Sequence, residues 1–301
     1  MKRYTPILFL VLVSIATARG NPQDFTVSSP SGATFKLSDA RGKFVALHFL
    51  LKTECPFCLK HTHSYALHAP EIAGVVHVFL KPDSAADIEK WTKDVDGRGI
   101  DVPTIYQDEN AKLADAFKIK NGFKFHGQVV HYPALVLLDP SGKEVFRYVG
   151  KDNTDRYSFE KFTAKMQELW AGELKSQHLD ENRLAVKGFD PVAYIDENKA
   201  AAGDEKITSL YRGATYRFST PEHRKRFAAD PEKYAPQYGG WCATGVAHGD
   251  KIDIDPTRFK VTNRRLFLFY KGLLGDALDA WNKDEPRLTQ SADENWPKLA
   301  K

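Results

Sequence analysis

The sequence predicts two domains: an α/β domain with a mixed central sheet flanked by helices, followed by a small α+β domain. The length of 301 residues suits two domains of ordinary size. Residues 24–172 alternate apolar, strand-like runs with helix-like segments, whereas residues 184–301 consist of short aromatic-rich segments with many turns. Residues 173–183 are polar and charged without a strong period, and we interpret them as the linker.

The composition excludes several classes of protein. Hydrophobic residues make up 42% and charged residues 27% of the chain, so wholesale disorder and a collagen-like fibre are excluded. The net charge is +4 and no long stripe of lysine and arginine stands out, so we expect no nucleic-acid partner. Three cysteines are too few for a disulfide-rich scaffold, and their odd number leaves at least one without an intramolecular partner.

Residues 1–18 have the pattern of a secretory signal peptide. Lys2 and Arg3 form a positive head, Ile7–Val13 is an unbroken apolar run, and Ala16-Thr17-Ala18 fits a cleavage site with small residues. The apolar run is too short to span a membrane, and no other stretch is long and apolar enough to do so. We therefore expect a protein without a membrane span after cleavage, placed in the periplasm or secreted, where disulfides persist.

The elements of the first domain follow from its periodicity. Near-continuous apolar runs predict strands buried on both faces, and a turn at Asp139-Pro140-Ser141-Gly142 predicts that the last two strands form a hairpin. Helical segments separate the other strands. The predicted strands cover residues 43–51, 75–80, 134–138 and 144–149, and the predicted helices cover residues 57–69, 85–95, 110–117 and 157–176.

A Cys55-Pro56-Phe57-Cys58 motif directly follows the first buried strand and opens a helix. A thiol at a helix N-terminus faces unpaired N–H groups and the positive end of the helix dipole, which stabilise its thiolate. Pro56 suits the first helical turn because its missing N–H is not needed there. Cys58 lies one turn deeper. We expect Cys55 to attack a disulfide and Cys58 to resolve the mixed disulfide.

The neighbours of the motif act on this chemistry in both directions. Lys52, Lys60 and His61 could lower the pKa of Cys55, while Glu54 opposes them. A CxxC motif by itself also fits half of a zinc site or a structural disulfide. The sequence contains no second CxxC and no standard Cys/His zinc spacing.

Further residues give the motif a more specific setting. Tyr132-Pro133 opens a late strand, and Leu138-Asp139-Pro140-Ser141-Gly142-Lys143 follows it. With Asp24-Phe25 and the CxxC, these residues resemble the thioredoxin superfamily over about residues 24–170. The similarity is to exported members of the alkyl hydroperoxide reductase/thiol-specific antioxidant type and to cytochrome c maturation thioredoxins.

The resemblance implies a thioredoxin-like fold and a site made of Cys55, Cys58 and Pro133. In that family the proline is cis and packs against the CxxC, which implies the same for Pro133. The implied activity is thiol–disulfide exchange with protein thiols and disulfides and with an upstream redox donor, and it requires no cofactor.

The sequence also departs from the family pattern. Glu54 stands where tryptophan is common, and Tyr132 stands where threonine or valine is common, so its ring could restrict entry to the site. A peroxiredoxin would carry Pro-x-x-x-Thr-x-x-Cys, and neither Cys55 nor Cys58 has this proline and threonine before it. A thiol-dependent peroxidase with antioxidant activity is therefore an alternative that the motif does not support.

Seven of the ten histidines lie between residues 48 and 131. We expect most of them at the surface and at helix ends. A second interpretation is copper handling, because thiolate and imidazole ligands suit copper. Cys55 and Cys58 would then supply two ligands, and His131, beside the Tyr132-Pro133 loop, would be the best-placed third.

The second domain carries Gly188-Phe189-Asp190-Pro191 and Tyr238-Gly239-Gly240-Trp241-Cys242. With the segments around them, these motifs resemble the YHS domain family over roughly residues 184–298, which implies a compact ββα-type core and a binding role. Residues 211–219 predict a hairpin strand, and residues 221–229 predict a helix capped by Thr220.

The metal-binding role suggested for the YHS family directs attention to three residues. Cys242, His223 and His248 could form a metal site with soft ligands. The alternative is that Cys242 is a small buried residue and that the histidines make local hydrogen bonds.

Overall fold

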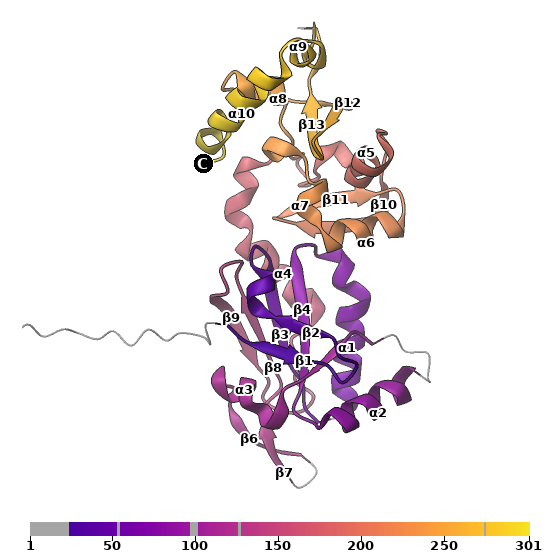
Figure 1. The fold of residues 1–301 in the computed structure, drawn as a ribbon, viewed down its shortest axis with the longest axis vertical. Helices are drawn as coiled ribbons and strands as arrows, with labels where there is room; N and C mark the ends of the chain where they lie inside the picture. Colours follow the sequence, from indigo (N-terminus) through magenta and orange to yellow (C-terminus); the bar gives the residue numbers. More distant parts are fainter. Residues whose placement is uncertain (1–23, 53–54, 97–101, 126–127, 274) are drawn as a thin grey trace, which may run out of the picture.

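The computed structural model describes residues 24–52, 55–96, 102–125, 128–273 and 275–301 (Figure 1). The predicted signal peptide, residues 1–18, lies outside the described residues. No described helix is long and apolar enough to cross a membrane.

The first part of the chain is built on a five-stranded mixed sheet with the order β5-β4-β3-β8-β9. β3, β4 and β5 are parallel to one another, and β8 and β9 run antiparallel to their neighbours. The four predicted strands are confirmed, while the three-residue β5 was not predicted because it is too short to show a period. The strands are β3 (Phe44–Phe49), β4 (Val75–Lys81), β5 (Ile105–Gln107), β8 (Ala134–Leu138) and β9 (Glu144–Val149).

Apolar side chains cover both faces of this sheet and form two clusters of buried residues, because alternate residues of a strand point to opposite faces. The first cluster contains residues of α1, α2 and α4, and the second contains residues of α3 and β1. A mixed sheet flanked by helices in this order is a thioredoxin-like fold, as predicted. The helices are α1 (Pro56–His68), α2 (Ala85–Asp96), α3 (Lys112–Ala116) and α4 (Phe159–Leu169).

Short elements complete the first part. The predicted helix over residues 110–117 begins as a 3₁₀ turn, and the predicted helix over 157–176 ends early and continues as a 3₁₀ helix. The hairpin of β6 and β7 was not predicted. These elements are β1 (Thr26–Ser28), β2 (Thr34–Lys36), η1 (Leu37–Ala40), η2 (Ala69–Glu71), η3 (Glu109–Ala111), β6 (Asn121–Phe125), β7 (Gln128–His131) and η4 (Ala171–Ser176).

The C-terminal part combines two long hairpins with short helices around buried aromatic rings. The predicted helix at residues 221–229 is confirmed as α6, and the Thr220 hydroxyl caps it by accepting from the His223 N–H at 3.1 Å. The predicted hairpin strand at residues 211–219 is confirmed as the second strand of the hairpin β10–β11, although residues 211–213 are the end of β10 and the turn.

The elements of this part are η5 (Val186–Gly188), α5 (Pro191–Glu197), β10 (Asp204–Tyr211), β11 (Ala214–Phe218), α6 (Pro221–Ala229), α7 (Pro231–Tyr234), η6 (Gln237–Gly240), α8 (Ala243–Ala247), β12 (Asp255–Thr262), β13 (Arg265–Phe269), β14 (Lys271–Gly272), β15 (Gly275–Asp276), α9 (Ala277–Lys283) and α10 (Glu285–Leu299). The proposed domain limits and the YHS resemblance stay predictions.

The two parts meet at the end of the sheet where β3 and β4 begin (Figure 1). The N–H of Ala73 donates to the Leu210 carbonyl at 2.9 Å, and Lys43 Nζ donates to the Ala229 carbonyl at 3.1 Å. Gly74 permits this approach, because a Cβ there would lie 2.9 Å from the Tyr211 ring. The CxxC follows the other end of β3, so the C-terminal part packs away from it.

Candidate functional site

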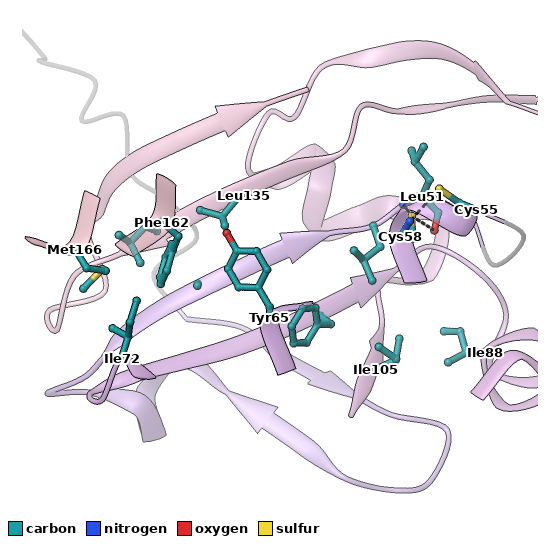
Figure 2. Close-up of a cluster of buried hydrophobic side chains, with 14 of the residues drawn as sticks. Leu51, Cys55, Cys58, Tyr65, Ile72, Ile88, Ile105, Leu135, Phe162 and Met166 are labelled. Carbon is teal, nitrogen blue, oxygen red and sulfur yellow. Dashed lines mark hydrogen bonds between the residues drawn. The ribbon is translucent and has the colours of Figure 1, made fainter. Parts of the chain in front are cut away.

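Cys55 and Cys58 lie where β3 leads into α1, as the sequence predicts. Cys55 is the N-cap of α1, Pro56 occupies the first turn, and the Cys58 N–H donates to Cys55 Sγ at 3.3 Å. Both cysteines are free thiols in the structure, and they are only 1% and 0% exposed. Figure 2 shows the pair at one end of a cluster of buried apolar side chains.

Polar groups from distant parts of the chain reach the two sulfurs. Arg156 Nη2 lies 3.5 Å from Cys55 Sγ and 3.3 Å from Cys58 Sγ. The carbonyls of Asn153 and Asp155 accept from Arg156 Nη1 at 2.8 and 3.4 Å and orient the guanidinium. Cys55 Sγ donates to Asn153 Oδ1 at 3.5 Å. One arginine in the connection between β9 and α4 therefore contacts both sulfurs.

A buried lysine adds a second positive charge on the inner side of the pair. Lys81, the last residue of β4, is fully buried, and its Nζ donates to the Leu51 carbonyl at 3.2 Å. The same Nζ lies 4.4 Å from the centroid of the Trp91 ring. The Leu51 N–H donates to Cys58 Sγ at 3.3 Å. Burial lowers the pKa of Lys81, while the nearby thiols and Asp83 raise it.

The pair is arranged to share one negative charge. Burial raises the pKa of Cys58, but the hydrogen bond from Cys55 and the charges of Lys81 and Arg156 outweigh it and lower that pKa to about 6. The hydrogen bond to Cys58, burial and the charge of Cys58 raise the pKa of Cys55. Two interacting thiols titrate together, so the pKa shifts describe the pair as a whole. The pair loses its first proton easily.

Sequence analysis expects a stabilised thiolate at Cys55, and in the structure the stabilising contacts also reach Cys58. Cys58 receives the Leu51 N–H and lies near both cations, whereas Cys55 receives one N–H and the same guanidinium. The expectation that His61 acts as a charged tuner is wrong. Burial and the charge of Arg156 lower the pKa of His61 to about 3, so its ring is neutral.

Three histidines form a buried chain behind the pair. His48 Nδ1 lies 2.9 Å from His61 Nε2, and His48 Nε2 lies 3.0 Å from His77 Nδ1. The ring of Tyr65 packs against all three. A neutral imidazole offers one donor and one acceptor, so both contacts can be hydrogen bonds if the rings are in matching tautomers. His77 Nε2 is buried and has no hydrogen-bond partner among the described residues.

The prediction that most histidines of this region lie at the surface is wrong for His131, which is 3% exposed. It is also wrong for the chain of His48, His61 and His77, of which the last is partly buried. Their side chains point to the face of the sheet that α1 and α4 cover, and burial lowers the pKa of His48 well below its usual value and that of His77 to about 4. Sequence reasoning missed them because each stands in a different element.

Pro133 stands at the start of β8, close to Arg156. The two residues line a cavity of about 10 Å³ together with His61, Tyr148 and Asp155, which is roughly the room of one water molecule. No described peptide bond is cis, so the expected cis bond before Pro133 is corrected to trans. The trans form is the more stable one for an X–Pro bond, and the resemblance alone implied the other.

The candidate metal ligands lie in separate environments. His131 Nδ1 is 2.8 Å from the Tyr132 carbonyl, and Cys242 Sγ accepts from the Tyr270 N–H at 3.3 Å. His223 lies between Asp190 (Nδ1, 2.7 Å) and Glu197 (Nε2, 3.2 Å), and the exposed His248 caps the end of α8. Within the described ranges no three His, Cys, Asp or Glu side chains are placed to hold a metal ion.

Comparisons with known proteins find similarity in the first part of the chain. Residues 20–145 match the model of the AhpC/TSA family. No curated protein matches the chain. Among solved structures, the exposed lipoprotein thioredoxin of Streptococcus pneumoniae is 23% identical, with a TM-score of 0.38, over 48% of this chain and 98% of that one.

Two further solved structures are similar at lower identity. A peroxiredoxin-like protein of Aquifex aeolicus is 14% identical, with a TM-score of 0.41, over 48% of this chain and 83% of that one. A yeast mitochondrial 1-Cys peroxiredoxin is 16% identical, with a TM-score of 0.45, over 54% and 80%. The matched family model covers residues 20–145, and the strand order of the same part of the chain is that of a thioredoxin-like fold.

Proposed function

We propose that the protein is an exported thiol–disulfide oxidoreductase that uses Cys55 and Cys58 on protein substrates. The observation that carries the proposal is the position of Arg156 Nη2, 3.5 and 3.3 Å from the two sulfurs at the start of α1. A thiolate, and not a thiol, is the nucleophile of disulfide exchange, so a cation fixed on both sulfurs favours the reactive form.

The reaction needs no cofactor. Cys55 passes its proton to Cys58 and attacks one sulfur of the partner's disulfide, whose S–S bond breaks as the mixed disulfide forms. Cys58 then attacks Cys55, closes the Cys55–Cys58 bond and releases the second partner thiol. Two electrons pass to the partner, and one proton of the pair and one from solvent protonate the released thiols. An upstream dithiol donor returns the two electrons.

Reduction of insulin with a dithiol donor tests the proposal. Cys55→Ser and Cys58→Ser are expected to reduce the rate to background, because either change removes half of the redox pair, whereas the matched Cys242→Ser keeps it. Undiminished activity of Cys55→Ser would overturn the proposal. In addition, Cys58→Ser should accumulate a mixed disulfide on Cys55; accumulation only in Cys55→Ser would reverse the assigned order of attack.

The proposal extends to location and to the C-terminal part. Export by residues 1–18 predicts that the mature protein begins after Ala18, which the mass of protein recovered from the periplasm or medium measures. The C-terminal part is proposed to bind a target. The packing at the far end of β3 and β4 is compatible with this role, since the C-terminal part does not cover the CxxC end.

A thiol-dependent peroxidase is the second candidate. The nearly unexposed sulfurs, the pKa of about 6 for Cys58 and the AhpC/TSA match favour it. A thiolate would take one oxygen of a peroxide and release an alcohol or water. The resulting sulfenic acid would condense with the second thiol to a disulfide and water. Peroxide consumption that depends on a dithiol donor, without insulin reduction, would favour this candidate over the first.

A further inference from the structure

The connection between β9 and α4, residues 150–157, covers the dithiol. Asn153 Oδ1 and Arg156 Nη2 both lie 3.5 Å from Cys55 Sγ, and Arg156 also contacts Cys58. Pro56 and Phe57, which separate the two cysteines, are exposed, with Phe57 at 38%. On the side of Cys55 away from the core, side chains of residues 150–157 therefore contribute to hiding the sulfurs, while Cys58 is also enclosed by the core cluster.

This cover is ordered by hydrogen bonds within it. Asp152 Oδ1 accepts from the Thr154 N–H at 2.8 Å, the Thr154 hydroxyl at 2.7 Å and the Asp155 N–H at 3.1 Å. Asp155 Oδ2 accepts from the Lys151 N–H at 2.9 Å. An Asx-type turn of this kind fixes the backbone locally.

Two contacts attach the cover to the sheet. The hydroxyl of Tyr148, in β9, donates to Asp155 Oδ1 at 2.5 Å, a charge-assisted bond that we call the latch. The Gly150 N–H donates to the Pro133 carbonyl at 2.8 Å. Gly150 permits this close approach, because a Cβ there would lie 2.3 Å from the Asp155 carbonyl oxygen and 3.0 Å from Pro133.

A disulfide must bring one of its sulfurs into direct line with the attacking sulfur. Cys55 is 1% exposed as a residue, so its sulfur has no room to reach a disulfide on the surface of a folded partner. We infer that residues 150–157 determine which disulfides Cys55 accepts: small ones enter beside the cover, and protein disulfides react only when the Tyr148–Asp155 latch opens. This inference rests on the proposed function for its substrates, but the cover itself is independent of activity.

Alkylation of Cys55 by two maleimides of different size tests the cover. N-ethylmaleimide and a polyethylene-glycol maleimide share one chemistry, so the ratio of their rates, normalised to unfolded protein, measures access and not the thiol pKa. Wild-type protein should strongly favour the small reagent. Tyr148→Phe should lower the preference about 10-fold, the change expected in a local opening equilibrium when one charged hydrogen bond is lost.

Two further variants complete the design. Tyr157→Phe is the matched control, because it removes one hydroxyl from the same connection but from a bond to the Lys161 carbonyl. It should leave the ratio unchanged. Asp152→Ala, which removes the internal turn, should lower the ratio as Tyr148→Phe does. Equal ratios in wild-type and unfolded protein, or in Tyr148→Phe and wild type, would overturn the inference.

The outcomes separate the inference from the proposed function. A size preference that depends on Tyr148, in a protein that reduces no disulfide, would keep the cover and reject the oxidoreductase. Reduction of insulin that depends on Cys55, with no size preference in alkylation, would keep the oxidoreductase and reject the cover. With both intact, Tyr148→Phe should accelerate reduction of insulin more than reduction of a small disulfide.

Discussion

The surroundings of Cys55 and of Cys242 differ although their local structures are alike. Each cysteine is the N-cap of a helix, and each is 1% exposed. Around the Cys55–Cys58 pair lie the guanidinium of Arg156 and the buried amine of Lys81. Cys242 Sγ instead accepts one backbone N–H, and its cluster consists of apolar and aromatic side chains. The difference between the two sites therefore lies in the cations that distant segments supply, and we expect these cations, more than the helix position, to make a thiol reactive.

Removing the two cations should produce the largest effect. In Arg156→Gln combined with Lys81→Met, the pKa of Cys58 should rise from about 6 toward its ordinary range, because only the hydrogen bond from Cys55 then opposes the effect of burial. The thiolate fraction at pH 7 should fall about 30-fold or more. Titration of thiolate ultraviolet absorbance measures this directly. Lys60→Gln, an exposed neutral substitution on α1, serves as the control and should leave the titration unchanged.

Single variants sharpen the same comparison. Arg156→Gln and Lys81→Met should each raise the pKa of Cys58 by about one unit, since each removes one of two charges. If neither substitution moves the titration, the helix N-terminus and the Leu51 N–H account for the thiolate, and the difference from Cys242 lies elsewhere.

Acid should destabilise the first part through its histidine chain. The folded-state pKa values of His61 and His77, about 3 and 4, lie below the value of about 6.5 for an unfolded chain. Their contribution to stability is therefore complete above pH 6.5 and is lost as the pH falls from 6.5 toward 4 and 3. At pH 5 each ring should cost about 2 kcal/mol relative to neutral pH.

Urea unfolding between pH 8 and pH 5 measures this linkage. In His77→Gln the slope of the unfolding free energy against pH should decrease by the contribution of one titrating histidine. This decrease does not depend on the absolute stability of the variant. The control His68→Gln removes a histidine outside the chain, one that pairs with Glu71, and its slope is the reference for the slope of His77→Gln. A wild-type slope in His77→Gln would show that folding does not lower the pKa of His77.

Cys242 should show the smallest effect. Cys242→Ala is expected to cost about 1–2 kcal/mol of stability, because it leaves a small cavity in an apolar cluster. The rate of insulin reduction should not change. If Cys242→Ala instead loses activity while its folding is unchanged, Cys242 takes part in the reaction, and the contrast between Cys242 and the Cys55–Cys58 pair disappears. Counting the free thiols before and after the reaction would then identify its role.

The parts of the fold that the sequence predicts are those set by local pattern. β3, α1 and the N-cap position of Cys55 follow from an apolar run, a proline and helix-start chemistry within a few residues. Arg156 follows Cys58 by 98 residues, and its role appears only when the chain folds.

The histidine chain and Lys81 were missed for a related reason. His48 and His77 stand in apolar strands where a single polar residue carries no period, and their hydrogen bonds exist only through strand order. Lys81 ends a strand, where a lysine is ordinarily exposed, and nothing in the sequence indicates that its side chain is buried. The bond before Pro133 was assigned by resemblance alone, and the structure gives the trans form.

The reduction potential of the pair tests the central claim most directly. Equilibration with glutathione or dithiothreitol, followed by mass mapping of each cysteine, should show one two-electron transition. Its expected potential lies between about −270 and −120 mV, with Cys55 and Cys58 oxidised together and Cys242 remaining a thiol. Two free thiols at Cys55 and Cys58 under all oxidising conditions, or a disulfide that includes Cys242, would contradict the account.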